Sequence, residues 1–123
     1  MRLLGLVIEE PDKSSSERCK IFLVTEYMGK GSLLEYLRSR GRQYVTKKDQ
    51  IKFAHDTCCG MAYLESVNVV HRDLAARNVL LSEDGQAKVA DFGLASSDGA
   101  TVEGGKLPIK WTAPEVINFV KLV

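Results

Sequence analysis

The chain has 123 residues, of which 45% are hydrophobic and 27% are charged, and its formal net charge is +1. This composition is typical of a soluble globular chain with at most one domain. The near-neutral charge gives no argument for binding to nucleic acid or to a membrane surface. No apolar stretch approaches the roughly 20 residues needed to span a bilayer. Three cysteines, two of them adjacent, offer no disulfide framework and no metal-ligand spacing, and they fit a reducing cytosol and a cytoplasmic location.

Two strands are predicted near the N-terminus. The first covers Leu3 to Glu9, and the polar residues 11–17 form a connecting turn after it. The second covers Lys20 to Thr25, a short apolar run rich in strand-forming residues. A run of this kind predicts a strand that is buried.

Two helices are predicted next. Gly31-Ser32 opens a short helix from Leu33 to Ser39. A long helix starts at Thr46 and runs to about Ser66, because Thr46 and Asp49 have the spacing of a capping box. Apolar residues recur at three- and four-residue steps along this helix and predict a core-facing stripe of Ile51, Ala54, Cys58, Met61 and Leu64.

A hairpin is predicted after the long helix. Two short apolar segments, residues 79–81 and 87–89, flank Glu83-Asp84-Gly85. An acidic residue followed by glycine between two such segments indicates a tight turn.

Three short motifs give the strongest functional signal, and they stand in one order. They are His71-Arg72-Asp73-Leu74-Ala75-Ala76-Arg77-Asn78, Asp91-Phe92-Gly93 and Ala113-Pro114-Glu115. Taken singly, each is ordinary: an Asp after an Arg is usually a solvated loop charge, and a lone Asn is usually a turn former. Together they match the catalytic loop, the metal-binding turn and the end of the activation segment in the protein-kinase signature set.

The residue types in these motifs suit phosphoryl transfer, which depends on positioning and charge neutralisation. Asp73 is the candidate carboxylate that orients the attacking hydroxyl and accepts its proton. Asn78 offers a neutral oxygen to magnesium, and Asp91 offers an anionic one. Magnesium needs few protein ligands beside phosphate oxygens, so this pair suffices. Gly93 allows the backbone to turn sharply behind Asp91.

On these motifs the chain resembles a protein kinase, and two segments resemble tyrosine kinases in particular. Residues 74–77 lack the Lys that serine/threonine kinases usually place after the catalytic Asp. Residues 106–111 look like the tyrosine-kinase substrate platform, in which Pro108 flanks the incoming phenol. The resemblance implies an α+β, two-lobed kinase fold. Residues 1–28 would be the end of the small lobe and the lobe connection, and residues 29–123 the start of the large lobe.

The resemblance also implies roles for residues outside the motif carboxylates. The cofactors would be ATP and magnesium. Backbone groups of Glu26 and Met28 would bind the adenine edge, Thr25 would guard the deeper pocket, and Leu80 would form the floor under the ring. Arg77 joins Asp73 and Asn78 as a catalytic-loop residue.

Two residues beside the catalytic Asp have structural or regulatory roles in relatives. His71 is expected to pack against Phe92. Arg72 in relatives often pairs with a phosphorylated activation loop.

Within tyrosine kinases, the resemblance is strongest to the C-terminal Src kinase family, through residues 26–33, 36–42 and 105–108. No tyrosine occurs between Gly93 and Trp111, so activation by tyrosine phosphorylation there is not expected. The resemblance implies a protein-tyrosine substrate, Src-family kinases among them, and SH2 and SH3 domains in the parent protein.

The sequence contains neither a GxGxxG loop nor a V-A-I-K strand. It is therefore expected to be a fragment of a kinase domain that is inactive by itself. Two alternatives stay open here: a fragment of a receptor tyrosine kinase, and a truncated, non-catalytic scaffold or regulatory isoform.

Overall fold

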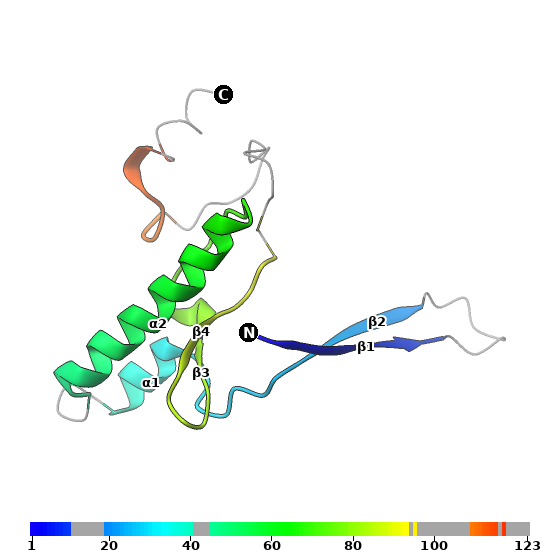
Figure 1. Ribbon diagram of the computed structural model, residues 1–123, viewed down its shortest axis with the longest axis horizontal. Coiled ribbons are helices and arrows are strands. Elements are labelled where there is room, and N and C mark those ends of the chain that lie inside the picture. The colour runs from blue at the N-terminus through cyan, green and yellow to red at the C-terminus, as the bar shows by residue number, and fades with distance from the viewer. Residues whose placement is uncertain (11–18, 41–44, 94, 96–108, 116, 118–123) are drawn as a thin grey trace.

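The computed structural model describes residues 1–10, 19–40, 45–93, 95, 109–115 and 117. The predicted connecting turn at 11–17 and the platform segment up to Pro108 lie outside these residues. The elements in chain order are β1 (Leu3–Glu9), β2 (Lys20–Thr25), α1 (Leu33–Arg40), α2 (Lys47–Ser66), the 3-10 helix η1 (Ala76–Asn78), β3 (Val79–Leu81) and β4 (Ala87–Val89). Helices and two small antiparallel sheets thus combine, as the predicted α+β class requires (Figure 1).

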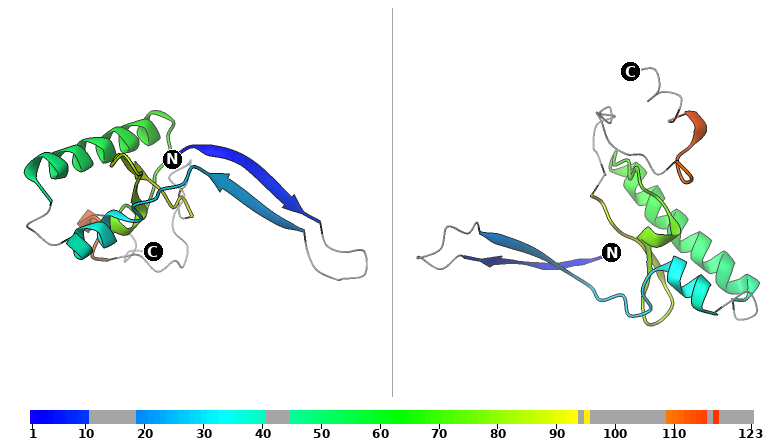
Figure 2. Two further views of the ribbon diagram at one scale, coloured as in Figure 1. Left: turned by 90° about the horizontal axis from the view of Figure 1, so that it is seen from below. Right: turned by 180° about the vertical axis from the view of Figure 1, so that it is seen from behind.

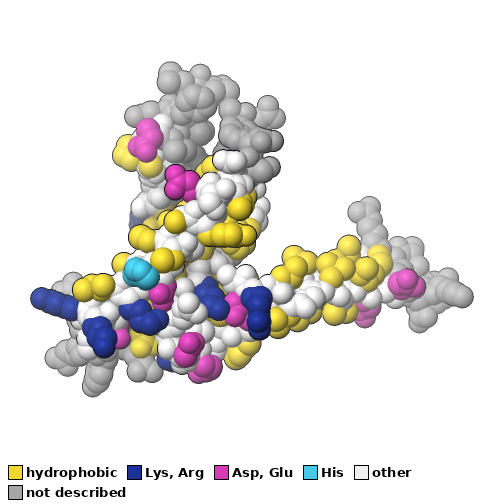
Figure 3. Space-filling view, in the orientation of Figure 1, with side chains coloured by type: hydrophobic (Ala, Val, Ile, Leu, Met, Phe, Trp, Pro, Cys, Tyr) yellow, Lys and Arg dark blue, Asp and Glu magenta, His cyan; other side chains and the backbone are white. Residues whose placement is uncertain are grey.

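Strands β1 and β2 form an antiparallel hairpin that projects as an arm from the rest of the molecule (Figures 1 and 2). The prediction that β2 is buried is wrong, because Ile21 is 63% exposed and Leu23 is 67% exposed. The physical reason is that no element among the described residues covers either face of the hairpin. Apolar side chains consequently line the arm (Figure 3).

Helix α2 begins as the capping box predicted. The Thr46 hydroxyl accepts a hydrogen bond from the Asp49 N–H at 3.1 Å, and an Asp49 carboxylate oxygen accepts one from the Thr46 N–H at 3.0 Å. These bonds satisfy backbone donors that a helix leaves without partners in its first turn. The predicted start and the predicted end near Ser66 are both confirmed.

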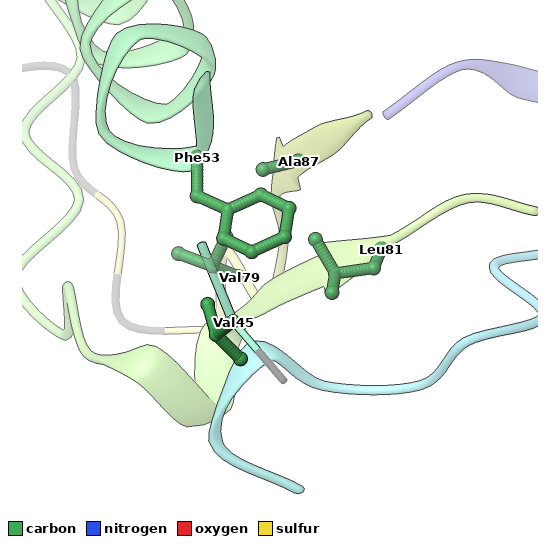
Figure 4. Close-up of a cluster of buried hydrophobic side chains, with 5 residues drawn as sticks. All are labelled: Val45, Phe53, Val79, Leu81 and Ala87. Atoms are coloured by element: carbon green, nitrogen blue, oxygen red, sulfur yellow. The ribbon is translucent and has the colours of Figure 1, made fainter. Parts of the chain in front are cut away.

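The hydrophobic core lies where α2 crosses the β3–β4 hairpin. Phe53 points from α2 into a cluster with residues of both strands and of the segment before α2 (Figure 4). The Tyr36 ring of α1 meets Phe53 edge to face, with centroids 5.9 Å apart. Such aromatic pairs add to the stabilisation from burial. The cluster consists of Val45, Phe53, Val79, Leu81 and Ala87.

The apolar stripe predicted for α2 is mostly not the face that packs. Ile51 is 70% exposed, and Ala54 and Cys58 are exposed as well. Of the predicted residues only Leu64 is buried, together with Phe53. Gly60 lies on the packed face, where a Cβ atom would come 3.0 Å from the Val89 side chain. Helix α2 thus comes close to the Val89 side chain of β4 at Gly60, which periodicity in the sequence does not reveal.

The hairpin predicted around Glu83-Asp84-Gly85 is confirmed. Val79 pairs with Val89 and Leu81 with Ala87 in antiparallel register. Gly85 has φ +77°, a conformation that glycine adopts without strain. The turn holds β3 and β4 together directly after the motif at residues 71–78.

Replacing Thr46 with Ala should lower the free energy of unfolding by about 1 kcal/mol, because the first turn of α2 loses its side-chain acceptor. Urea unfolding followed by circular dichroism measures this change. Thr46→Ser, which keeps the hydroxyl, is the matched control and should stay close to the unaltered chain. Equal stability of the Ala and Ser variants would show that the capping box does not stabilise the helix.

Candidate active site

Asp73, Arg77 and Asn78 meet in the loop that leads into β3. The Asn78 side-chain amide donates to the Asp73 carbonyl and to Asp73 Oδ2, both at 2.7 Å. The Arg77 guanidinium forms an ion pair with Asp73 Oδ1. Asn78 is buried, whereas the Asp73 side chain is 15% exposed and Arg77 40% exposed. The Asp73 carboxylate is therefore fixed on both oxygens but still reachable from solvent.

His71 connects this loop to the strand that precedes Asp91. Its Nε2 lies 2.9 Å from the Ala90 carbonyl oxygen, and its Nδ1 lies 3.2 Å from the Asp73 nitrogen. A carbonyl only accepts and an amide N–H only donates, so Nε2 carries the hydrogen and Nδ1 accepts. The predicted packing against Phe92 is confirmed, with ring centroids 5.3 Å apart. His71 is 1% exposed and thus acts as a structural link.

The backbone also joins the two motifs. The Ala90 N–H donates to the Asn78 carbonyl at 2.8 Å, so Asp91 follows directly after a residue bonded to the catalytic loop. Arg72 has φ +65° and Asp91 has φ +60°. Residues other than glycine adopt this conformation at a cost of roughly 1–3 kcal/mol, and such residues cluster at functional sites. Strain at one residue of each motif thus supports a site between them.

The chemistry of the donor set fits magnesium. The amide nitrogen of Asn78 donates to Asp73, and no group among the described residues donates to the Asn78 Oδ1 oxygen. The Asp91 carboxylate is exposed, and it accepts one bond, from the Gly93 N–H at 3.3 Å. One carboxylate and one amide oxygen are hard ligands of the kind that magnesium takes together with phosphate oxygens. Within the described residues no group of three or more His, Cys, Asp or Glu side chains could hold a metal ion.

Three of the four residues expected to contact the nucleotide lie at the end of β2 or just after it. Thr25 and Glu26 are half-buried, and Met28 is buried. The fourth, Leu80, lies in β3 and forms a bridge with Ser32. Ser32 belongs to the connecting segment, residues 26–32, which joins β2 to α1. That segment bonds to β3 through Lys30 N–H to Leu81 O at 3.1 Å and Leu81 N–H to Gly31 O at 2.9 Å. The connecting segment and the predicted floor residue are therefore side by side.

An ion pair that was not predicted holds the Glu26 side chain in place. Lys88 of β4 lies 2.7 Å from a Glu26 carboxylate oxygen, and the Arg2 N–H donates to the other oxygen at 2.6 Å. The hydrogen bond from Lys88 is the largest cause that lowers the Glu26 pKa, followed by the bond from Arg2. The pair spans 62 sequence positions, so no local pattern could have revealed it. It ties the start of the connecting segment to the β3–β4 hairpin.

Asp56, which the sequence did not single out, joins α2 to the β3–β4 hairpin. Its carboxylate accepts from Lys52 at 2.9 Å and from the Ala87 N–H at 3.1 Å. Lys52 in turn donates to the Gly85 carbonyl at 2.8 Å. Burial raises the pKa of Asp56, but the bonds from Lys52 and Ala87 outweigh burial and the net shift is downward.

A hollow of about 420 Å³ lies beside the site, between the start of the chain, α2 and β4. Glu26, Tyr63, Lys88 and Phe92 are among the residues that line it, whereas Asp73, Asn78 and Asp91 are not. The residues expected to carry the chemistry therefore do not line this hollow.

The comparisons with known proteins agree with the motifs. The profile described as protein tyrosine and serine/threonine kinase matches residues 1–123, so the chain belongs to that family. Members of this family use ATP and a divalent metal in general.

The relatives that the chain resembles are tyrosine kinases. It is 48% identical over 119 residues to tyrosine-protein kinase csk-1 of Caenorhabditis elegans, covering 94% of this chain and 21% of that protein. It is 44% identical over 118 residues to the megakaryocyte-associated tyrosine-protein kinase of Mus musculus, with 96% and 22% covered. It is 46% identical over 110 residues to tyrosine-protein kinase Src64B of Drosophila melanogaster, with 86% and 20% covered.

The chain thus spans about a fifth of the length of the curated relatives it matches. It belongs to the protein-kinase family and is similar to tyrosine kinases, and the kinase fold class expected from its motifs is confirmed. Among the helices of the described residues, none is long and apolar enough to cross a membrane.

Acid should lower the free energy of unfolding over a pH range that is set by the lowered carboxylate pKa values of Asp49 and Asp56. A lowered pKa stabilises the folded state above the unfolded value, and this stabilisation is lost as pH falls through the folded-state pKa. Urea unfolding should therefore give a flat free energy between about pH 5 and 7 and a decline below about pH 4. Asp56→Asn should reduce that decline, whereas Glu65→Gln, at an exposed position of the same helix, should leave it unchanged. An identical decline in both variants would contradict the role of Asp56.

Proposed function

We propose that this chain supplies the catalytic loop, the metal-binding turn and the lobe connection of an enzyme that transfers the γ-phosphate of ATP to protein tyrosine. One observation carries the proposal. The Asp73 carboxylate is held by Arg77 and Asn78, and the same loop is bonded to Ala90, the residue directly before Asp91. A base for the hydroxyl and two oxygen ligands for magnesium are thereby linked by hydrogen bonds.

The residues divide the work of phosphoryl transfer. Magnesium, when bound, neutralises phosphate charge, and Asn78 Oδ1 and the Asp91 carboxylate would hold it. Asp73 orients the tyrosine hydroxyl and accepts its proton. Arg77 balances the charge of Asp73 and keeps its carboxylate in one orientation. His71 supports the Asp73 backbone through its Nδ1 nitrogen.

The connecting segment supports adenine binding by its unused backbone groups. Within the described residues, neither the Glu26 carbonyl nor the Met28 N–H has a backbone partner. One acceptor and one donor two positions apart match the edge of an adenine ring. The Lys88–Glu26 ion pair anchors this segment beside Leu80, which we assign to the floor under the ring. Thr25 would then stand at the entrance to the deeper pocket.

We further propose that the substrates include Src-family kinases and that the whole protein is cytoplasmic and carries SH2 and SH3 domains. The similarity to tyrosine-protein kinase csk-1 supports this assignment. So does the sequence between Gly93 and Trp111, which has no tyrosine for an activating phosphate. Residues 96–108 of that segment lie outside the described residues. Control by attached domains would replace control by loop phosphorylation.

A chimera tests the proposed function directly. Residues 1–123 would replace the matching segment of the Caenorhabditis elegans relative, and phosphorylation of a tyrosine peptide would be measured. The chimera should be active, and Asp73→Asn in it should lower turnover on the order of 10²–10⁴-fold, the usual range for a positioned base.

Asp84→Asn is the matched control for that experiment. Asp84 is an exposed residue of the β3–β4 turn and accepts a hydrogen bond from Ser82, so its replacement should leave turnover within a few-fold. If the chimera is folded and active but Asp73→Asn keeps comparable turnover, Asp73 is not the base. If the folded chimera has no activity, the proposed function itself is wrong.

Asp91→Asn should act through the metal. Loss of the anionic ligand weakens magnesium binding, and we expect the magnesium concentration for half-maximal activity of the chimera to rise roughly tenfold or more, since even groups behind a ligand change affinity that much. Magnesium titration at fixed ATP measures the shift, with Asp84→Asn again as the control. An unchanged magnesium requirement would remove Asp91 from the metal site.

A further inference from the structure

Helix α2 carries a thiol and an imidazole at exposed positions, next to a carboxylate that is mostly buried. Cys59 Sγ lies 3.8 Å from Nε2 and 4.0 Å from Nδ1 of His55, one helical turn earlier. His55 Nδ1 lies 3.6 Å from Asp56 Oδ1. The His55 side chain is 73% exposed, and Cys59 is exposed. None of the three takes part in the phosphoryl-transfer site.

The carboxylate of this cluster is held in place from the protein interior. Asp56 is only 14% exposed and is bonded to Lys52 and to the Ala87 N–H. Its other oxygen, Oδ1, lies near Nδ1, which favours a hydrogen on Nδ1 and leaves Nε2, the ring nitrogen nearer to the sulfur, as the acceptor. A nucleophile beside a base that is itself oriented by a third group is the arrangement that activates thiols and hydroxyls in enzymes.

The other two cysteines lack this arrangement. Cys58 is the neighbour of Cys59 on the same helix and is equally exposed, but no described residue makes a hydrogen bond to its sulfur. The Cys19 thiol, also exposed, donates to the Glu9 carbonyl at 3.5 Å, and a carbonyl does not take up a proton. The chain therefore holds three exposed thiols of which one faces an imidazole.

From this geometry we propose that Cys59 is a reactive thiol that exchanges with low-molecular-weight disulfides, with His55 as its proton acceptor and Asp56 as the group that positions His55. This modification site is separate from the proposed kinase chemistry and does not depend on it. The reaction partner is any small, solvent-borne disulfide, because His55 and Cys59 stand at the surface.

The exchange balances without a further reagent. His55 Nε2 takes the Cys59 proton, and the sulfur attacks one sulfur of the disulfide. A new S–S bond to Cys59 forms while the disulfide's own S–S bond breaks. The departing thiolate takes the proton from His55 and leaves as a thiol. Cys59 is oxidised, and one half of the small disulfide is reduced.

Two single-site variants of the 123-residue chain isolate the thiols. Cys58→Ser keeps Cys59, and Cys59→Ser keeps Cys58, while Cys19 serves as the reference in both. The probe is oxidised glutathione, and mass spectrometry measures mixed-disulfide formation at each cysteine over time. Cys59 should react on the order of tenfold faster than Cys58, less than a fully aligned base provides, because the thiol contact is at the outer limit of a hydrogen bond.

Removing the base gives the decisive comparison. His55→Gln keeps a polar side chain at an exposed position, so it leaves the helix intact while the rate advantage of Cys59 should disappear. Unfolding in urea should abolish the advantage too, since the contact exists only in the helix. The proposal is overturned if Cys58 reacts as fast as Cys59 in the native chain. It is equally overturned if the advantage of Cys59 survives His55→Gln.

Discussion

The two hydrogen bonds from Asn78 to Asp73 are the interaction on which the candidate active site depends. Asn78 is the last residue of η1 and stands directly before β3, so its position is set by the β3–β4 hairpin. Helix α2 packs on that hairpin through Phe53, which in turn holds the hairpin in place. The hydrophobic core thus fixes the buried Asn78 amide, and the Asn78 amide fixes the Asp73 carboxylate, which solvent can reach.

The same hairpin organises the other parts of the site. Its second strand ends at Val89, and the next residue, Ala90, donates to the Asn78 carbonyl and accepts from His71, so the position of Asp91 is fixed. Lys88 of that strand reaches Glu26 and anchors the connecting segment. Asp56 bonds to Ala87 and fixes the strand against α2. Four polar contacts, made by the three-residue strand β4 and by Ala90 after it, therefore position the groups assigned to base, metal and nucleotide.

The sequence predicted correctly those structural features that depend on residues close together in the chain. The capping box located the start of α2, and the Asp84-Gly85 pair located the hairpin, because each feature depends on residues that are close in the chain. The grouping of Asp73 with Asn78 followed from a motif only eight residues long. The exposed faces were not predictable in this way. Ile51 and Ala54 have helical spacing, but burial depends on which face the hairpin approaches, and the close approach of Gly60 to the Val89 side chain exists only in the folded chain. The Lys88–Glu26 pair joins residues whose proximity only the fold creates.

A crystal structure of the chimera with manganese and a non-hydrolysable ATP analogue tests the central claim most directly. The account predicts anomalous density for a metal ion bound by both Asn78 Oδ1 and an Asp91 oxygen, with Asn78 still donating to Asp73. Ligand distances of about 2.0–2.2 Å are expected for a hard divalent ion of this size. A metal ion bound without Asn78, or an Asn78 amide turned away from Asp73, would contradict the claim that these hydrogen bonds build the site.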